Sequence, residues 1–397
     1  MPMQLNIELI KHPSWLISAI ACLFIQTANV FSFETKAEAA YVFDMTTGTV
    51  LISKNADKPL PPASMSKLMT LYVAFEVIRS GQLKLDERLP VSKHAQAYGG
   101  STMFLTTRDR VLVEDLLRGI IVLSGNDACA VIAEALSPDG TEEGFAELLT
   151  QRAQRMGLTN SVFKNSNGWP AKDHRMSMRD LALLTKRLIL DFPEFYPLFS
   201  QKEFLFDGRA PANRLNRNPL LGLGIGADGL KTGHTKEAGY GLVGSAKQAD
   251  RRLIFVFSGL SSAAERAYEA EAIVKWAFRQ FTLKSFGKKD TNVATAHVWN
   301  GAVSKVGLAL SKDLNVLVPT LSEKSLDFAV EYESPIPAPI KAGQKIGNLI
   351  FTTGNMDAVK IPLVALKEVP VGGPFKRVIT AVKVLLSKII SAPEVAL

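Results

Sequence analysis

Three short motifs, far apart in the chain, constrain this sequence more than any other feature. They are Ser64-Met65-Ser66-Lys67, Ser124-Gly125-Asn126 and Lys231-Thr232-Gly233, in that order. Each motif alone is weak, because an S-x-x-K string occurs roughly once or twice by chance in a chain of this length. A second such string does stand at 161–164. The ordered set, with each member in a suitable local context, indicates a fold that gathers a helix start, a loop and a strand around an activated serine.

Length and composition are those of a globular protein. The 397 residues predict two or three structural units, and 47% hydrophobic residues allow a sizeable core. The formal net charge is +8, but Lys and Arg are mostly scattered and we find no nucleic-acid-binding motif, so we expect no nucleic-acid partner. An anionic membrane or cell-wall surface fits this charge better.

The N-terminal segment 1–32 is typical of a secretory signal. Its apolar run, 15–25, is shorter than a membrane-spanning helix requires, and small residues follow it. We expect cleavage between Ser32 and Phe33. A site at 37–39 is the alternative, although it would cut into an expected strand, and an uncleaved N-terminal anchor also stays open.

The chain has two cysteines. Cys22 lies in the expected signal, so an exported mature protein would keep Cys129 alone and have no internal disulfide. Cys129 lies in an apolar helical stretch, and we interpret it as a small buried core residue rather than a catalytic thiol. No His/Cys cluster has metal-ligand spacing, so we predict neither a metal nor an organic cofactor.

Periodicity and turn signals predict an α+β domain over 33–288, in which helices pack around an antiparallel sheet. Ser177 and Asp180 have the spacing of a helix capping box. The predicted strands lie at 41–43, 49–52, 242–245 and 253–257, and the predicted helices at 64–78, 111–136 with a break at 124–126, 142–157, 177–190 and 265–281.

From about residue 290 short β-like runs alternate with turn signals, which predicts a small all-β domain over 289–368. Three prolines within 334–343 exclude a central strand there. The remaining segment, 369–397, is predicted to be a linker and an amphipathic helix. Its part 375–390 combines apolar residues at helical spacing with Lys and Arg, which is typical of a helix lying in a membrane interface. A helix docked on the protein is the alternative.

Ser64 and Lys67 are three residues apart, so on a helix they share one face and the amine reaches the hydroxyl. A serine hydroxyl becomes a good nucleophile only when a nearby base takes its proton, and a desolvated lysine can be that base. Prolines before Ser64 and an apolar helix after it place the serine at a helix N-terminus. Alone, the motif would be an N-cap with a solvated lysine. The string at 161–164 is followed by a loop signature, and we assign it no chemistry.

The other two motifs supply polar groups for a peptide-like substrate. Ser124 could relay a proton and Asn126 could hold the substrate amide, although the string alone would be a simple helix break. Lys231 and Thr232 open an expected strand, whose edge suits pairing with an extended peptide, and they could grip a terminal carboxylate. Gly233 permits close backbone approach. Backbone N–H groups of Ser64 and His234 could form an oxyanion hole. The His234 imidazole has no evident partner and is given no acid–base role; a turn with exposed charge is the alternative interpretation.

Through these three motifs and several longer matching segments, given at the end of this paragraph, the chain resembles the D-alanyl-D-alanine carboxypeptidases among the low-molecular-mass penicillin-binding proteins. The resemblance implies Ser64 as acyl-enzyme nucleophile, Lys67 as general base, Ser124 as proton relay and Lys231 as substrate contact. It also implies that Arg217 and Arg266 lie near the substrate carboxylate. The stretch 212–227 departs from the family by being apolar and glycine-rich, which leaves the rim of the site open. The matching strings are 62–64, 125–129, 216–218, 228–235 and 238–240.

The resemblance implies a transpeptidase/β-lactamase-like domain followed by a C-terminal β domain. It also implies an exported serine peptidase, peripheral on the periplasmic face of a bacterial inner membrane, that removes the terminal D-Ala from peptidoglycan stem peptides. β-Lactams should acylate the same serine. A β-lactamase is one alternative, although the Glu-x-x-Leu-Asn segment of class A enzymes is not found between the second and third motifs. A non-catalytic peptidoglycan-binding, shape-maintaining protein is the other.

Overall fold

The computed structural model describes residues 33–320, 326–353, 359–375, 378, 379 and 382. Within this part the chain forms two compact units that divide between Arg279 and Gln280. The predicted signal 1–32 lies outside the described residues, as does most of the predicted amphipathic helix 375–390. No helix in the described part of the chain has both the length and the apolarity to cross a bilayer.

The first unit, Phe33–Arg279, is built on an antiparallel sheet of five strands in the order β2-β1-β7-β6-β5. The central strand β7 is buried along nearly its whole length, and its run Leu253–Phe257 is apolar without alternation. A strand has such a continuous apolar run when both faces of its sheet are covered by other elements. The bounds are β1 Ala39–Asp44, β2 Val50–Lys54, β5 Ala227–Thr235, β6 Gly239–Gln248 and β7 Arg251–Leu260.

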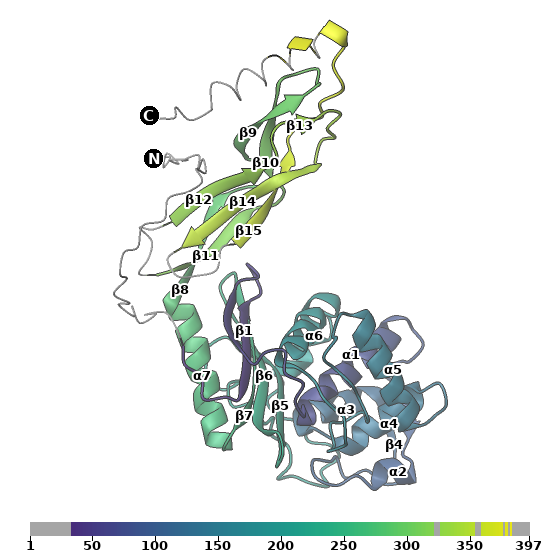
Figure 1. Cartoon of the computed structure of the whole chain (residues 1–397). Helices are drawn as coiled ribbons and strands as arrows, with labels where there is room; N and C mark the ends of the chain where they lie inside the picture. Colours follow the sequence, from purple (N-terminus) through teal and green to yellow (C-terminus); the bar gives the residue numbers. More distant parts are fainter. Residues whose placement is uncertain (1–32, 321–325, 354–358, 376–377, 380–381, 383–397) are drawn as a thin grey trace. The chain divides into compact units, whose positions relative to one another are not determined.

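Helices cover both faces of this sheet, as the sequence predicted. Figure 1 shows α7 on one side and the cluster of α1 to α6 on the other. Ser177 caps α6 by accepting a hydrogen bond from the Asp180 backbone N–H, at 3.1 Å, which confirms the predicted helix start. The bounds are α1 Lys67–Arg79, α2 Lys93–Gln96, α3 Val113–Arg118, α4 Asn126–Leu136, α5 Glu142–Arg155, α6 Met178–Asp191 and α7 Ala263–Gln280.

Shorter elements connect these helices. The helix predicted from Ser64 begins as a 3-10 turn, η1 (Ala63–Ser66), and becomes α-helical only at Lys67. The predicted break at 124–126 is present between the π-helical turn η2 (Gly119–Leu123) and α4. The remaining short elements are β3 Arg88–Pro90, β4 Arg110–Leu112 and η3 Tyr196–Ser200.

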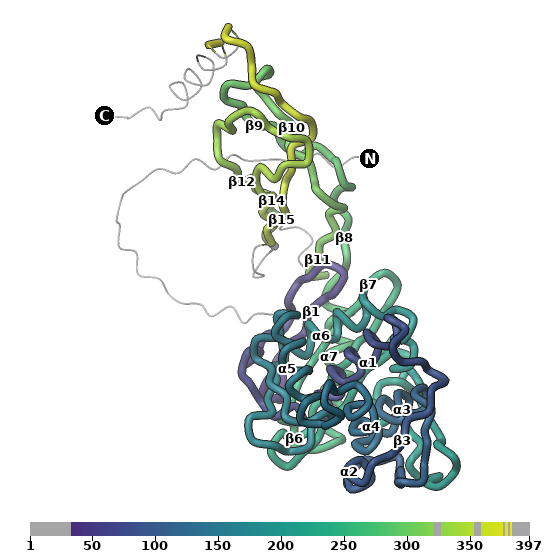
Figure 2. Tube along the Cα trace, turned by 90° about the vertical axis from the view of Figure 1, so that its right-hand side faces the viewer, coloured from purple at the N-terminus to yellow at the C-terminus, as the bar shows by residue number. Residues whose placement is uncertain are grey.

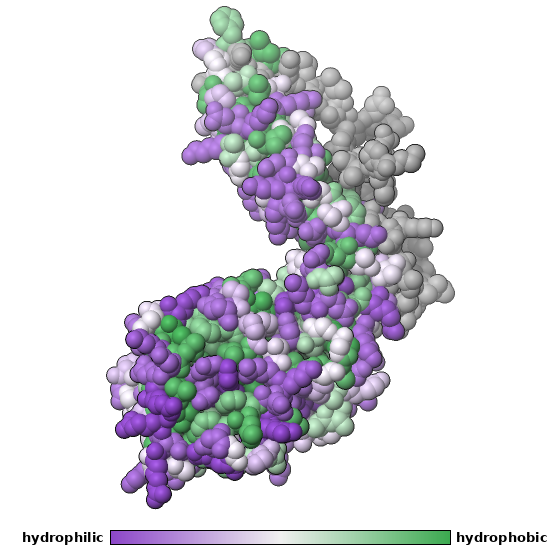
Figure 3. Space-filling model, turned by 180° about the vertical axis from the view of Figure 1, so that it is seen from behind, coloured by the Kyte–Doolittle hydropathy of each residue, from purple (hydrophilic) through white to green (hydrophobic). Residues whose placement is uncertain are grey.

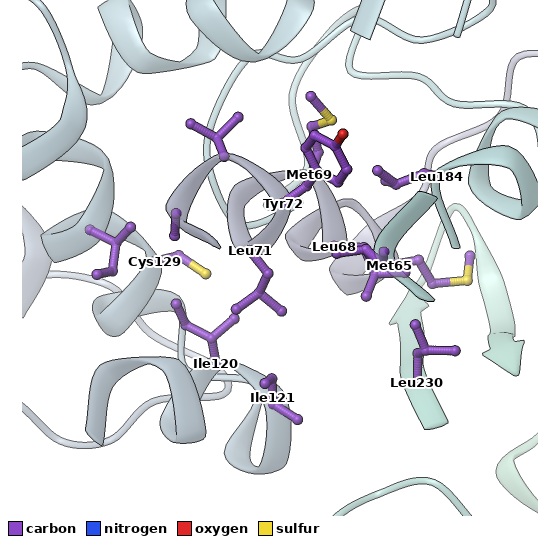
Figure 4. Packing of buried hydrophobic residues seen from close by; sticks show 14 of the residues in the cluster. Met65, Leu68, Met69, Leu71, Tyr72, Ile120, Ile121, Cys129, Leu184 and Leu230 are labelled. Atoms are coloured by element: carbon purple, nitrogen blue, oxygen red, sulfur yellow. The ribbon is translucent and has the colours of Figure 1, made fainter. Parts of the chain in front are cut away.

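Helix α1 lies at the centre of the core. Its first nine residues, from Lys67 to Phe75, are all buried, and all of them except Lys67 and Thr70 are apolar or aromatic. Figure 4 shows Ile120 and Cys129 on one side of α1 and Leu184 and Leu230 on the other. Cys129 is a free cysteine and fully buried, as predicted for a core residue.

The surface of the first unit is mixed in polarity. Figure 3 shows one of its faces, on which hydrophobic residues form patches among hydrophilic ones. Such interspersion is ordinary for a soluble unit whose core is closed, because there is not enough polar surface to cover it.

The second unit, from Gln280 onward, is all-β, as predicted. Six strands form one sheet in the order β12-β14-β15-β10-β9-β13, all of which are labelled in Figure 1, and β8 pairs with β11. Figure 2 shows β9, β10, β12, β14 and β15 from a second direction. The proline-bearing β13 stands at the sheet edge, in accord with the exclusion of a central strand there. The bounds are β8 Phe281–Gly287, β9 Asn292–Trp299, β10 Lys305–Leu310, β11 Leu314–Pro319, β12 Leu326–Tyr332, β13 Ile336–Pro337, β14 Lys345–Thr353 and β15 Val359–Ala365.

Strand β8 was not expected from the sequence. It begins at Phe281, directly after α7 ends at Gln280. The junction has no Gly or Pro, so no local signal separates the helix from the strand. Pairing with β11, from Phe281 opposite Pro319 to Gly287 opposite Leu314, is the tertiary contact that makes this segment extended.

We predict that Phe75→Ala in α1 lowers the free energy of unfolding by about 3–5 kcal/mol, because it opens a cavity in a closed core. Phe75 is fully buried, and its ring stacks on Phe195 with centroids 4.7 Å apart. Tyr268→Ala is the matched control, since Tyr268 is 70% exposed, and should change stability by less than about 0.5 kcal/mol. Urea unfolding measures both; equal losses in the two variants would contradict the central role of α1.

Candidate active site

Ser64 and Lys67 stand where η1 passes into α1. The two residues face the same side, and Lys67 Nζ donates a hydrogen bond of 2.7 Å to Ser64 Oγ. Lys67 is fully buried, whereas Ser64 is half-buried. A hydroxyl that can meet a substrate is therefore paired with an amine that is withdrawn from solvent.

The Lys67 amine has two further partners. Its Nζ donates to Asn126 Oδ1 at 2.7 Å and to the Asn167 carbonyl oxygen at 2.5 Å. Burial lowers the pKa of Lys67 from its ordinary value to about 8, an effect that nearby acidic groups partly oppose. A substantial fraction of this lysine is therefore neutral near physiological pH and able to accept a proton.

The second motif makes a sharp turn before α4. Ser124 has a left-handed backbone with φ of 62°, which ends η2 and turns the chain toward α4. Asn126 is held from both ends: its backbone N–H donates to the Ser101 carbonyl at 2.7 Å, and its side-chain Nδ2 donates to the Gly99 carbonyl at 2.9 Å. The Asn126 side-chain amide is thus fixed in the orientation in which its Oδ1 accepts the hydrogen bond from Lys67 Nζ.

Asp127 ties a neighbouring loop to this motif. Its buried carboxylate accepts hydrogen bonds from the backbone N–H groups of Met103 and Leu105, at 2.9–3.1 Å. The stretch from Gly99 to Leu105 is therefore anchored to the start of α4, and it forms part of the wall around Asn126.

The third motif brings a second buried lysine to the site. Lys231 Nζ, on β5, donates to Ser124 Oγ at 2.9 Å and to the Thr232 carbonyl at 3.2 Å. Burial, together with the charges of Lys67 and Arg217, lowers the pKa of Lys231 well below its ordinary value. The hydroxyl of Ser124 thus contacts a basic group that is itself easily deprotonated, which suits proton transfer.

Gly233 lets η1 approach β5 closely. A Cβ at this position would lie 2.9 Å from Met65 Cγ and 3.0 Å from the Pro62 carbonyl oxygen. The close neighbour at Gly233 is therefore the chain's own segment that carries Ser64. Within its five-stranded sheet β5 is a terminal strand, so its free edge can pair with an extended peptide.

The remaining predicted residues border this arrangement. The exposed His234 ring stacks on Tyr240 with centroids 3.8 Å apart, and the Arg266 guanidinium lies over the same Tyr240 ring at 5.7 Å. Arg217 donates to Ser101 Oγ, next to the carbonyl that receives the Asn126 backbone. Among the described residues no protein group pairs with Arg266 Nε. Both arginines are thus held beside residues of the second and third motifs.

Two residues of the site were missed from sequence. Asn167 reaches Lys67 through its main-chain carbonyl, an atom that every residue type carries, so residue identity gives no signal. Glu142 begins α5 and holds the neighbouring Ser166, and an acidic first helical residue is common without any role in a site. Within the described residues no group of three or more His, Cys, Asp or Glu could hold a metal ion.

The S-x-x-K string at 161–164 occupies a different setting. The Ser161 hydroxyl is fully buried and donates to Asp180 Oδ2 at 2.7 Å. Its partner is thus an acceptor at the start of α6, and the serine helps to hold that helix end.

Comparisons with known proteins find relatives over most of the chain. A family profile described as D-alanyl-D-alanine carboxypeptidase matches residues 25–261, and one for the C-terminal domain of penicillin-binding protein 5 matches 281–371. D-Alanyl-D-alanine carboxypeptidase DacC of Escherichia coli (strain K12) is 37% identical, covering 91% of this chain and 93% of the relative.

Solved structures show the same fold. Penicillin-binding protein 5 from Haemophilus influenzae is 30% identical, covers 86% of this chain and 99% of its own, and has a TM-score of 0.76. Penicillin-binding protein D2 from Listeria monocytogenes, in its ampicillin-bound form, is 31% identical over 61% of this chain and 97% of its own, with a TM-score of 0.55.

These matches confirm a mixed α/β transpeptidase-like domain followed by an all-β domain. They do not favour the β-lactamase or the non-catalytic alternative, since the relatives that cover most of the chain are named carboxypeptidases. The chain therefore belongs to the D-alanyl-D-alanine carboxypeptidase family of serine hydrolases, among the low-molecular-mass penicillin-binding proteins.

Proposed function

We propose that Ser64 attacks the penultimate D-Ala carbonyl of a peptidoglycan stem peptide and forms an acyl-enzyme. The observation that carries this proposal is the 2.7 Å contact between Ser64 Oγ and the buried Lys67 amine. As the Oγ–C bond forms, the hydroxyl proton passes to neutral Lys67. The C–N bond to the terminal D-Ala then breaks, and Ser124 relays a proton to the leaving amine. Water finally releases the peptide by hydrolysing the ester.

The substrate is proposed to lie along the free edge of β5. Asn126 would hold its amide, while Lys231 and Thr232, with Arg217 and Arg266 nearby, would bind the terminal carboxylate. Backbone N–H groups of Ser64 and His234 would stabilise the oxyanion, and the close approach of β5 to η1 at Gly233 supports this assignment. The environment of Lys231 supports this arrangement: burial and the charges of Lys67 and Arg217 disfavour its charged form, and a bound carboxylate would favour that form.

The same serine is proposed to react with β-lactams, whose strained amide presents a carbonyl to the nucleophile and whose carboxylate can occupy the same cationic end. The ampicillin-bound form of the related Listeria monocytogenes protein supports this extension. No metal or organic cofactor takes part in the proposed chemistry.

Export and peripheral attachment to the periplasmic face of an inner membrane complete the proposal. The segment 1–32 would be the cleaved signal, and 369–397 would hold the enzyme at the membrane near peptidoglycan. Support comes from the basic amphipathic pattern of 375–390. Four apolar residues within the described part of this tail are also markedly exposed: Phe375 at 88%, Val378 at 64%, Ile379 at 53% and Val382 at 48%.

We predict that Ser64→Ala abolishes the covalent adduct with a labelled penicillin and lowers D-Ala release by at least about a thousandfold. Intact-protein and peptide mass spectrometry locate the adduct. Ser66→Ala is the matched control and should keep the adduct, because the Ser66 hydroxyl donates to the Ala63 carbonyl and not to a base. Rapid penicillin turnover without release of D-Ala would contradict a carboxypeptidase.

We predict that acylation by penicillin rises with pH through an apparent pKa of about 8, because only neutral Lys67 can take the Ser64 proton. Below that pH the ammonium form dominates and the rate falls. Lys67→Arg should lose acylation by at least about a hundredfold, since a guanidinium does not deprotonate in this range. Rates with a fluorescent penicillin test both; a profile that is flat between about pH 6 and about pH 10 would remove Lys67 as the base.

We predict that truncation after Gly373 releases the enzyme from anionic phospholipid vesicles while D-Ala release from a soluble peptide stays within about twofold of the full chain. Vesicle flotation measures the first and an amino-acid assay the second. A full-length variant in which Lys383 and Lys388 are replaced by Glu should bind weakly, because the charges then repel anionic lipid. Undiminished flotation of the truncated protein would place the membrane contact elsewhere.

A further inference from the structure

Glu142 is a buried carboxylate beside the site that the proposed chemistry does not use. It is the first residue of α5, and only 3% of its side chain is exposed. Its Oε1 accepts hydrogen bonds from the backbone N–H and the hydroxyl of Ser166, and a longer one of 3.4 Å from Asn167 Nδ2. Its Oε2 contacts His94 Nε2 at 2.6 Å and Tyr98 OH at 2.7 Å.

These contacts lead directly to the Lys67 amine. Ser166 and Asn167 are adjacent, and the Asn167 carbonyl accepts from Lys67 Nζ at 2.5 Å. The Ser166 carbonyl accepts from Thr70 Oγ1, one turn further along α1, at 2.6 Å. The pair 166–167, here called the acceptor segment, is therefore held by Glu142 on one side and by α1 on the other.

The residue that follows the acceptor segment also packs closely against η1, the turn that contains Ser64. Gly168, with φ of +80°, follows it, and a Cβ there would lie 1.9 Å from the Ala63 carbonyl oxygen. There is no room for the segment to move toward η1. Glu142 restrains it from moving away, because the carboxylate accepts hydrogen bonds from both the main chain and the hydroxyl of Ser166. Asn165 Oδ1, which accepts from the backbone N–H groups of Asn167 and Gly168, adds to this restraint.

The charge of Glu142 is well compensated. Burial alone would raise the pKa of this carboxyl, but hydrogen bonds from Ser166 and His94 outweigh burial and lower that pKa. The carboxylate is therefore ionised at neutral pH, and hydrogen bonds to an ionised acceptor are short and directional. Such a group is better suited to fixing a loop than a neutral side chain of the same length.

We propose that Glu142 is a positioning residue for acyl transfer: by anchoring the acceptor segment, it presents the Asn167 carbonyl to Lys67 and holds the amine against Ser64. The inference rests on the proposed function of Ser64 and Lys67. Without the anchor, Lys67 keeps Ser64 and Asn126 but loses a fixed third acceptor. The amine then samples orientations that do not point at the hydroxyl, and its protonated form is less stabilised.

The test compares two conservative variants. Glu142→Gln keeps the length and an oxygen for Ser166, and its amide nitrogen can donate to His94 or Tyr98. Glu142→Asp keeps the charge but is one methylene too short to bridge Ser166 and Tyr98. Positioning predicts that Gln retains acylation within about fivefold and that Asp loses it by about thirtyfold. A purely electrostatic role for the charge predicts the reverse order and would overturn the proposal.

A pH profile separates positioning from a general loss of structure. In Glu142→Asp and Glu142→Ala the ammonium form of Lys67 loses its carbonyl partner, so the acid limb of acylation should move down by about 1 pH unit while the plateau falls. A structural defect would lower the amount of active protein and leave the limb in place. The other ionisable groups facing Lys67 and Glu142 are unchanged in each variant: Asp127 and Cys129 on α4, Lys231 on β5, Arg217 in its loop, His174 in the loop before α6, and His94 and Tyr98 around α2.

Tyr98→Phe is the matched control. It removes one partner of Oε2 and the interaction of the Tyr98 hydroxyl with the Asn167 side chain, but it leaves both hydrogen bonds between Glu142 and Ser166. Acylation and its acid limb should therefore stay within about threefold and about 0.3 pH unit of the parent. Thermal melting checks that each variant is folded. If the parent forms its Ser64 adduct while Glu142→Asp matches it in rate and pH profile, positioning by Glu142 is wrong. If the parent itself forms no adduct at Ser64, it is the proposed function that fails.

Discussion

Withdrawing the Lys67 amine from water is the constraint on which the rest of this structure depends. An ammonium group is costly to bury, so the protein supplies acceptors from Ser64, Asn126 and Asn167 and tolerates a pKa near 8. In solution the same lysine would be almost wholly charged and useless as a base. Burial therefore converts a common surface residue into a group that can activate a hydroxyl.

The fold achieves this by placing α1 in the middle of the core. A helix surrounded on every side cannot tilt or rotate without disturbing its neighbours, so Ser64 and Lys67 keep their relation to α4 and β5. Gly233 then removes the side chain that would separate η1 from β5. The acceptor segment closes the remaining side and is itself backed by Glu142. The positions of Ser64 and Lys67 are thus fixed in three ways: by the packing of α1, by the close approach of β5 at Gly233, and by the buried carboxylate of Glu142.

Much of the site could be predicted because its chemistry is local. Ser64 and Lys67 are three residues apart, and helix geometry alone brings them together. The cap at Ser177 follows from residue preferences at helix ends. The break was also predicted, but its left-handed backbone falls on Ser124 and not on Gly125. Strand β8 could not be predicted, because its partner β11 lies about thirty residues on and no turn residue marks its start. The residues chosen for substrate binding remain proposals, although the structure brings them to one region.

The sequence by itself determined the family and the α+β and all-β organisation, and it supplied a candidate nucleophile with a candidate base. Motifs and periodicity depend on residue types alone, which is why they could be recognised without the structure. Only the tertiary structure decided what surrounds the amine. The Asn167 carbonyl is a main-chain atom that every residue type has, so it cannot be recognised from the sequence. Glu142 acts through Ser166 from a separate helix, so the residues next to it in the chain do not indicate its role. Which groups stabilise a buried charge is a question of three-dimensional proximity, and proximity between distant segments is set by packing rather than by any single string of residues.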